Sequence, residues 1–425
     1  MLQVGFIRQN AGFVKQRLGI RNFKHPELVD EIIALDDEVK RLKKKTEDAQ
    51  MQINSRSDQI QKLIRNNQKE ETASIRDEVA LLKTVLAKER PELEQKNKSL
   101  EEKLLLLPNL PHSSVPPGTM PEENEIVREG GRKPIIPAGA LPHWELGKKY
   151  DLINFEMGNK VTGSGFPFYK NKGARLQRAL IQYFLDYNTA SGYIEYEPPL
   201  MVNEASAYGT GQLPDKEGQM YFAGTDNLYL IPTAEVPLTN IYRDEIVKES
   251  DLPLKMTAYT PCFRREAGSY GKDVRGLNRL HQFDKVEIVQ IVHPEKSYEV
   301  IEEMVNHIEK LLQNLELPFR ILRLCGGDMG FTSALTYDFE AYSAAQEKWL
   351  EVSSVSNFET FQSNRMKIRF RGRNADTKTQ LVHTLNGSSL ALPRIVAALL
   401  ENNQDGHGIL LPKVLHAYFG SGTIN

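Results

Sequence analysis

The residues between Cys262 and Glu287 combine side chains that could bind a phosphate, a base and an ammonium group. The stretch reads CFRREAGSYGKDVRGLNRLHQFDKVE, and its apolar ends and Gly-rich polar middle predict a hairpin with a long loop. Strand alternation would place Arg264 and Glu266 on one face, about 6–7 Å apart at roughly 3.3 Å per residue. On the returning strand it would place Phe283 and Glu287 on one face, about 13 Å apart.

Each of these side chains suits a different ligand group. A guanidinium binds phosphate or carboxylate through a bidentate pair of hydrogen bonds. A carboxylate accepts hydrogen bonds from an ammonium group, and a phenylalanine ring offers a stacking face to a base. A solvated surface hairpin would account for an isolated Arg-x-Glu, but it needs neither a long loop nor charges aligned beside an aromatic ring. We therefore interpret the hairpin as part of a binding site.

Length and composition exclude several other classes of protein. With 425 residues the chain can form two or three domains, and its net charge of -2 gives no overall signal for nucleic-acid binding. Two cysteines without a Cys-x-x-Cys motif argue against a disulfide scaffold and a cysteine zinc site. No segment approaches the roughly 20 apolar residues of a membrane span, and MLQVGFIRQN does not suggest a signal peptide. We expect no membrane association and a reducing, cytoplasmic compartment.

Two heptad-patterned segments lie near the start of the chain. Apolar residues follow a 4-3 alternation over 28–63, and a second seam covers 75–107. The polar stretch RNNQKEET separates them. Each helix alone would expose its apolar stripe, so we expect an antiparallel coiled-coil hairpin about 50 Å long at roughly 1.5 Å per residue.

The proline-rich stretch PNLPHSSVPPG cannot continue a helix and predicts a linker. The expected organisation is therefore a helical arm over 1–107, a linker over 108–118 and a second domain over 119–425. An exposed coiled coil is typical of a scaffold or a dimerisation rod. The alternative is an RNA-binding arm that contacts phosphates through its basic residues, for which the candidates are Lys40, Arg41, Lys43, Lys44, Lys45, Arg56, Lys62 and Arg65.

The second domain holds further polar segments at the ends of apolar runs. LYLIPTAEVPLTNIY predicts a strand that leads into Thr233, Ala234 and Glu235 at a helix start, where a plain cap is the alternative. KWLEVSS places Glu351 beside serines, and HTLNGSSLALPRIV predicts a strand, a turn and a helix that begins near Arg394. A long amphipathic helix, ARLQRALIQYFLDYNTA, precedes the strand-like GYIEYEPPLMV.

Together these segments resemble the three motifs of class II aminoacyl-tRNA synthetases. FRREAGSYGKDVRGLNRLHQF followed by KVE, the TAE segment and HTLNGS through Arg394 are similar to the seryl-tRNA synthetase family, and the resemblance covers essentially the whole chain. It implies an α+β fold in which an antiparallel coiled-coil arm precedes an antiparallel sheet flanked by helices. It also implies a cytoplasmic homodimer that acts in protein biosynthesis as a serine--tRNA ligase. Its expected partners are L-serine, ATP, Mg²⁺ and tRNA(Ser), with tRNA(Sec) where a cell has one.

The resemblance also implies a role for each matching residue. Arg264 would bridge the serine carboxylate and the α-phosphate, Arg394 would hold the γ-phosphate, and Phe283 would stack on adenine. Serine would contact Thr233, Ala234, Glu235, Arg264, Glu287 and Ser388. The nucleotide would contact Arg264, Arg265, Glu266, Leu280, Phe283, Glu351, Val352, Ser353, Ser354 and Arg394. Arg279 is a further phosphate candidate and Thr384 a further serine candidate, and Mg²⁺ would take oxygen ligands from Glu351 and Ser354.

Two other functions fit parts of the sequence. A related ligase that charges a carrier protein would keep the adenylate site but should lack a long tRNA-reaching arm. A non-catalytic coiled-coil adaptor would not need Arg264, Glu266, Glu351 and Arg394 to be intact. The family's usual Gly after Asn-Gly-Ser is Ser389 here, and Pro393 precedes Arg394. Neither difference removes a chemical group.

Overall fold

The computed structural model describes residues 1–66, 68–215, 218–266, 275–372 and 378–425. It divides into two compact units, one of Met1–Gly19 and Phe23–Pro108, the other of Ile20–Asn22 and Asn109–Asn425. Most of the loop expected in the predicted hairpin, residues 267–274, lies outside the described residues.

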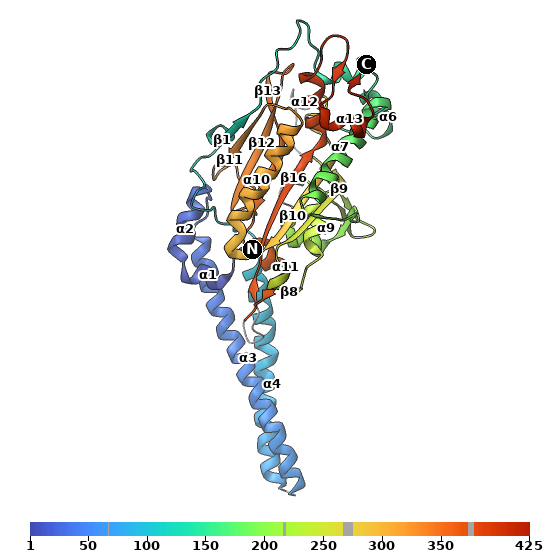
Figure 1. Cartoon of the computed structure of the whole chain (residues 1–425). Coiled ribbons are helices and arrows are strands. Elements are labelled where there is room, and N and C mark those ends of the chain that lie inside the picture. Colours follow the sequence, from blue (N-terminus) through green and yellow to red (C-terminus); the bar gives the residue numbers. More distant parts are fainter. Residues whose placement is uncertain (67, 216–217, 267–274, 373–377) are drawn as a thin grey trace. The chain divides into compact units, whose positions relative to one another are not determined.

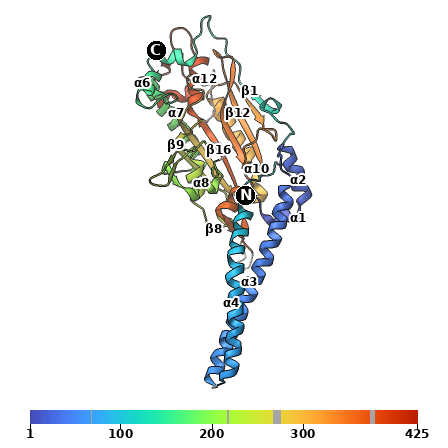
Figure 2. The same cartoon turned by 180° about the vertical axis from the view of Figure 1, so that it is seen from behind.

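The first unit is helical, and two of its helices form the expected hairpin. Its elements are α1 (Val4–Gln9), α2 (Ala11–Ile20), α3 (Leu28–Arg65) and α4 (Lys69–Leu104). The long helices α3 and α4 run antiparallel, side by side (Figures 1 and 2). The α3 seam is buried along most of its length, at Leu28, Ile32, Leu35, Val39, Leu42, Thr46, Ala49 and Ile53. The heptad prediction is confirmed.

Charged residues that interrupt the heptad seam pair across the two helices. Glu89 of α4, which is buried, forms an ion pair with Lys45 of α3. Lys96 Nζ lies 2.5 Å from a carboxylate oxygen of Glu38, and the guanidinium of Arg56 lies 2.9 Å from Glu78. A buried carboxylate without a partner is costly, so the pairing at Glu89 favours one alignment of the helices over shifted ones.

An eight-stranded sheet forms the centre of the second unit, in the order β1-β11-β12-β13-β16-β10-β9-β4. Neighbouring strands are antiparallel, except that the edge strand β4 runs parallel to β9. The predicted α+β class with a class II type of sheet is confirmed. The strand bounds are β1 Glu125–Gly130, β4 Ile194–Glu195, β9 Leu254–Phe263, β10 Gln282–Val292, β11 Phe319–Arg323, β12 Leu335–Ser343, β13 Lys348–Asn357 and β16 His383–Ala391.

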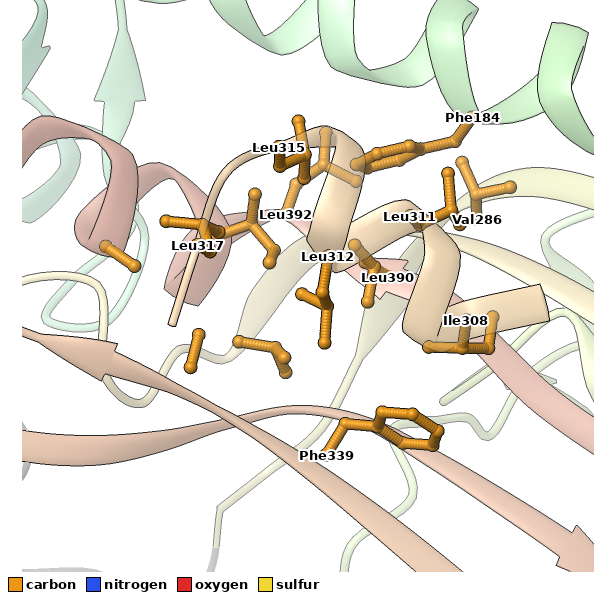
Figure 3. Close-up of a cluster of buried hydrophobic side chains, with 14 of the residues drawn as sticks. Phe184, Val286, Ile308, Leu311, Leu312, Leu315, Leu317, Phe339, Leu390 and Leu392 are labelled. Atoms are coloured by element: carbon orange, nitrogen blue, oxygen red, sulfur yellow. The ribbon is translucent and has the colours of Figure 1, made fainter. Parts of the chain in front are cut away.

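Three helices cover one face of this sheet: α7 (Asn171–Ala190), α10 (Ser297–Asn314) and α12 (Leu392–Asn402) (Figure 1). Figure 3 shows Phe184 of α7, Leu312 of α10 and Phe339 of β12 in the core between helices and sheet. On β10, Val286 belongs to this core, and strand alternation turns its neighbours toward the opposite face. That opposite face is where polar side chains can gather.

Shorter elements complete the second unit. Its remaining α-helices are α5 His143–Lys149, α6 Phe155–Val161, α8 Glu204–Thr210, α9 Glu235–Asn240, α11 Phe361–Met366 and α13 His416–Phe419. Its short strands are β2 Ile153–Asn154, β3 Phe168–Tyr169, β5 Met201–Asn203, β6 Phe222–Ala223, β7 Leu228–Leu230, β8 Ile246–Lys248, β14 Arg369–Arg371, β15 Gln380–Leu381, β17 Ile409–Leu410 and β18 Thr423–Ile424. Both cysteines are free and buried. In the described ranges, no helix has the length and apolarity needed to cross a membrane.

Candidate active site

A cavity of about 450 Å³ lies on the sheet face opposite the three helices. It brings together most of the residues singled out from the sequence: Thr233, Glu235, Arg264, Glu266, Leu280, Phe283, Glu287, Glu351, Val352, Ser353, Ser354, Ser388 and Arg394. Arg279 also lines the cavity. Three expected residues do not line it: Ala234, Arg265 and Thr384, whose contact is described below. Ala234 is fully buried before α9, and Arg265 is held through its backbone N–H, which donates to Gln219 O at 2.9 Å.

Glu287 lines the cavity and is 1% exposed. Its Oε2 lies 2.6 Å from Lys285 Nζ and accepts a 3.3 Å hydrogen bond from Ser388 Oγ. Its Oε1 has no hydrogen-bond partner among the described residues. Because buried polar atoms are normally paired, this oxygen is suited to accept a hydrogen bond from a ligand.

Lys285 is the main charged residue of the cavity that the sequence interpretation missed. Its ammonium group donates to Thr233 Oγ1 at 2.7 Å as well as pairing with Glu287, and the residue is 5% exposed. The strand alternation that links Phe283 to Glu287 also places Lys285 on their face, so the signal was present. Lys285 holds the Thr233 hydroxyl and the Glu287 carboxylate in fixed positions.

Glu235 is a second buried carboxylate in the same cavity. Its two oxygens accept hydrogen bonds from Gln362 Nε2 at 2.6 Å and from Asn386 Nδ2 at 2.8 Å. Burial raises the pKa of Glu235 to about 7, against the opposing effect of the hydrogen bond from Gln362. Thr384, a candidate from the sequence, does not line the cavity but donates to Gln362 Oε1 at 2.7 Å, so it orients a partner of Glu235.

Glu266 reaches the cavity by a different route from the one expected. Strand β9 ends at Phe263, but the backbone N–H of Arg264 still donates to His281 O at 2.9 Å, so alternation places Arg264 on the face of Cys262 and Phe283. Glu266 adopts a left-handed backbone with φ of 48°, so strand alternation does not account for its position in the cavity. The guanidinium of Arg264 lies 5.2 Å from the centre of the Phe283 ring, a cation–π contact. Glu266 forms an ion pair with Arg279.

Arg394 lies at the start of α12, and two backbone carbonyl groups from other segments hold its guanidinium. Its Nε donates to Asn278 O at 3.0 Å and its Nη1 donates to Glu351 O at 2.7 Å. These bonds connect the return end of the hairpin, the strand β13 and the helix α12 through one guanidinium. The cavity thus presents three arginines and an aromatic ring together with two buried carboxylates, which suits an anionic nucleotide beside a small ligand with an ammonium group.

Comparison with known proteins shows which family the chain belongs to. A seryl-tRNA synthetase N-terminal domain model matches residues 1–111, and a tRNA synthetase class II core domain (G, H, P, S and T) model matches residues 222–403. The serine--tRNA ligase of Salinibacter ruber is 49% identical over 425 residues, which cover 100% of this chain and 99% of that protein. The chain belongs to the seryl-tRNA synthetase family.

Two further proteins are similar to the chain over nearly all of its length. A serine--tRNA ligase of Methylacidiphilum infernorum is 47% identical, with 99% of each chain covered. The seryl-tRNA synthetase from Pyrococcus horikoshii, solved in complex with ATP, has a TM-score of 0.92 and 34% identity, covering 100% of this chain and 99% of that one. The family expectation from the sequence is confirmed.

Within this seryl-tRNA synthetase fold, Glu351 and Ser354 carry oxygen atoms of the kind that a nucleotide-borne Mg²⁺ accepts. Both line the cavity, and carboxylate and hydroxyl oxygens are ligands that Mg²⁺ accepts. Across the described ranges, no group of three His, Cys, Asp or Glu side chains is placed to hold a metal. An ion at Glu351 and Ser354 would therefore need phosphate oxygens to complete its coordination, which is the usual way in which Mg²⁺ binds.

Proposed function

We propose that this chain is an ATP-dependent serine--tRNA ligase, which forms seryl-adenylate and then transfers the seryl group to the 3′ end of tRNA(Ser). We extend the proposal to tRNA(Sec) in cells that have one, and we place the enzyme in the cytoplasm. The observation that carries the proposal is a single cavity in which a buried Glu287 oxygen, unpaired among the residues that the structure describes, lies with Arg264 and Phe283. Membership of the seryl-tRNA synthetase family supports it.

In the first step, a carboxylate oxygen of serine attacks the α-phosphorus of ATP, and the bond to pyrophosphate breaks. The protein forms no covalent bond in this step, so it accelerates the reaction by positioning the reactants and by stabilising charge. Arg264 would contact the serine carboxylate and the α-phosphate together. Phe283 would stack on adenine, with Glu266 and Leu280 beside it, and Arg394 would hold the γ-phosphate.

Mg²⁺, held by Glu351 and Ser354 together with phosphate oxygens, would neutralise part of the charge of the triphosphate. In the second step, a ribose hydroxyl at the 3′ end of the tRNA attacks the carbonyl carbon of seryl-adenylate, and AMP leaves. The residues that orient the serine in the first step would hold the same seryl group in the second.

The polar side chains around Glu287 account for a preference for serine. The Glu287 oxygen without a partner, the Ser388 hydroxyl and the Thr233 hydroxyl would face the ammonium and hydroxyl groups of the substrate. A site built on such groups rejects an analogue that lacks the hydroxyl, because its buried polar atoms would stay unpaired. Alanine should therefore be a very poor substrate, whereas threonine must be excluded by the size of the cavity.

The test is serine-dependent ATP–pyrophosphate exchange, with alanine, threonine and cysteine as controls. We expect exchange with serine alone, followed by charging of tRNA(Ser) but not of a tRNA for another amino acid. An absence of exchange with any amino acid, in folded protein with Mg²⁺, would contradict the proposed function and favour an adaptor. Exchange without tRNA charging would instead point to a ligase with another acceptor.

The raised pKa of Glu235 predicts how serine use depends on pH. Above about pH 7 the carboxylate is ionised and can pair with the ammonium group of serine, and below it protonation removes the charge. We therefore expect kcat/KM for serine to fall about tenfold between pH 8 and pH 6. Measuring exchange across this range checks the prediction. Glu235→Gln should have a low and nearly flat profile, and an unchanged profile in that variant would contradict the assignment.

We also propose that the enzyme is a homodimer, formed at the β4 edge of the eight-stranded sheet. Ile194 of this edge strand is 61% exposed, and Met201 and Phe222, on the edge strands β5 and β6 of the small three-stranded sheet, are also exposed, as is Leu200. Exposed apolar side chains on a sheet edge indicate a surface that a partner covers. Sedimentation at micromolar concentration should give twice the mass of the chain, and Ile194→Asp should shift it toward the monomer. A monomeric wild-type protein would contradict this proposal.

A further inference from the structure

A buried His–Glu pair lies in the second unit, outside the cavity. His143 begins α5 and Glu401 lies near the end of α12, and both are fully buried. Glu401 Oε1 is 2.7 Å from His143 Nδ1 and also accepts a hydrogen bond from the backbone N–H of His143 at 2.9 Å. Such a pair is costly to bury unless its remaining polar atoms are satisfied, so the partners of both side chains show what it does.

The other ring nitrogen of His143 accepts a hydrogen bond from the hairpin. The backbone N–H of Leu277 donates to His143 Nε2 at 2.8 Å. A backbone N–H can only donate, so Nε2 carries the lone pair and Nδ1–H donates to Glu401. Burial acts to raise the pKa of Glu401, but hydrogen bonds from His143 and Ser343 outweigh it and lower that pKa. The carboxylate therefore fixes the ring in the tautomer that can hold Leu277.

The return end of the hairpin approaches His143 closely. Gly276 has a φ of +72°, and a Cβ atom at this position would lie 2.2 Å from His143 Nε2. Glycine is therefore required both by the backbone conformation and by the contact. The guanidinium of Arg275 lies 4.6 Å from the ring centre of Trp144, the neighbour of His143. His143 and Trp144 of α5 thus contact Leu277 and Arg275, the residues on either side of Gly276.

A second connection runs from Glu401 to the cavity through Gln346. Gln346 Nε2 donates to Glu401 Oε1 at 3.0 Å, and Gln346 Oε1 accepts from Asn278 Nδ2 at 2.9 Å. Asn278 O in turn accepts the 3.0 Å hydrogen bond from Arg394 Nε. Leu277, Asn278, Arg279 and Leu280 all line the cavity. The His143–Glu401 pair is therefore one hydrogen bond from the cavity wall and connected to Arg394 through Asn278.

We propose that His143 is a positioning residue for ATP. Glu401 orients the His143 ring so that Nε2 accepts from Leu277. This bond fixes residues 277–280 and, through Asn278, the Arg394 guanidinium. The inference rests on the proposed function, because it assumes that Arg394 and Leu280 contact the nucleotide. It predicts a selective effect. Most serine contacts come from β10, β16 and the start of α9, none of which the pair holds through these hydrogen bonds. Arg264, which would also contact serine, donates its backbone N–H to His281 O and is not bonded to the pair. Disturbing the pair should therefore weaken ATP binding and leave serine binding nearly unchanged.

Two substitutions at His143 separate its two hydrogen bonds. In His143→Asn the side-chain amide can still donate to Glu401 but is too short to reach Leu277. In His143→Gln the longer side chain places an oxygen near the Nε2 position, where it can accept from Leu277. We expect His143→Asn to raise KM for ATP about tenfold in the exchange assay, as for the loss of a well-placed buried hydrogen bond. KM for serine should stay within about twofold, and His143→Gln should recover most of the ATP affinity.

Asn402→Ala is the matched control for a purely structural role. Asn402, the buried neighbour of Glu401 on α12, donates to Tyr342 O at 2.7 Å and accepts from the backbone N–H of Ala344 at 2.9 Å, so its loss should lower the melting temperature without changing KM for ATP. If His143→Asn does not fold, Gln346→Met tests the same connection and should raise KM for ATP about threefold.

Three results would overturn the proposal. They are equal rises in KM for ATP and for serine, equal effects of His143→Asn and His143→Gln, or an Asn402→Ala variant that behaves like His143→Asn. These results differ from a failure of the proposed function, in which the wild-type protein would show no serine-dependent exchange at all.

Discussion

Replacing Glu287 with alanine is expected to lower serine-dependent ATP–pyrophosphate exchange by about 1,000-fold or more. The substitution removes Glu287 Oε1, which no described residue bonds and which would accept a hydrogen bond from serine. It also leaves the ammonium group of Lys285 buried without its partner carboxylate. Removing one partner of a buried, hydrogen-bonded charge pair between protein and ligand typically costs about 2–5 kcal/mol or more of binding, and each 1.4 kcal/mol corresponds to a factor of about ten. The fall should appear in kcat/KM for serine.

A double variant separates lost recognition from lost stability. Glu287→Ala alone should lower the melting temperature, because Lys285 is only 5% exposed and would be left with Thr233 alone. Lys285→Met combined with Glu287→Leu replaces the pair with apolar side chains of similar size, which buried pairs often tolerate. We expect this double variant to recover stability but not exchange. Exchange at wild-type rates in Glu287→Ala, or recovered exchange in the double variant, would contradict the role assigned to Glu287.

The parts of the fold that sequence periodicity predicts are those in which burial follows the chain locally. The 4-3 spacing that includes Leu35 and Val39 requires a partner helix, and α3 and α4 provide it. In the hairpin, period-two alternation predicted that Phe283 and Glu287 share a face, and both line the cavity. Lys285 lies on the same face, but strand alternation does not show that a lysine is buried there.

Other parts of the site depend on contacts between distant segments. Gln362 belongs to α11 and reaches Glu235 from 127 residues further along the chain, and no local pattern marks it. Glu266 reaches the cavity through a left-handed turn, which the sequence Arg-Arg-Glu does not signal. His143 lies in a segment that mixes aromatic and turn residues, and nothing in that segment marks it. Only the tertiary structure shows that its two ring nitrogens bond Leu277 and Glu401. Resemblance to a family supplied roles for residues, whereas the structure supplied their partners.

Removing the arm is expected to separate the two reactions. After deletion of residues 36–96, a short linker can join the two cut ends, because the helices lie side by side where they are cut. Ion pairs between Lys96 and Glu38 and between Lys103 and Glu31 show this. Packed helix axes are about 8–10 Å apart, so a Gly/Ser linker of about four residues can join Leu35 to Asn97. Pyrophosphate exchange should stay within about twofold of the intact protein, because every residue of the cavity lies in the other unit. Aminoacylation should fall about 100-fold or more, since phosphate contacts supply much of the affinity for a nucleic acid.

Point substitutions on the intact arm distinguish tRNA contacts from residues that stabilise the hairpin. Lys45 pairs with buried Glu89, so Lys45→Ala should mainly lower the melting temperature. Lys44, Lys62 and Arg65 are exposed and form no salt bridge within the described residues, so their side chains can reach phosphates. The triple alanine variant of these three should raise KM for tRNA about tenfold and reduce its salt dependence, with unchanged exchange. Equal losses of exchange and aminoacylation in the deletion would show that the arm supports the fold of the enzyme rather than the binding of tRNA. A triple variant with normal tRNA KM would place the phosphate contacts elsewhere on the arm.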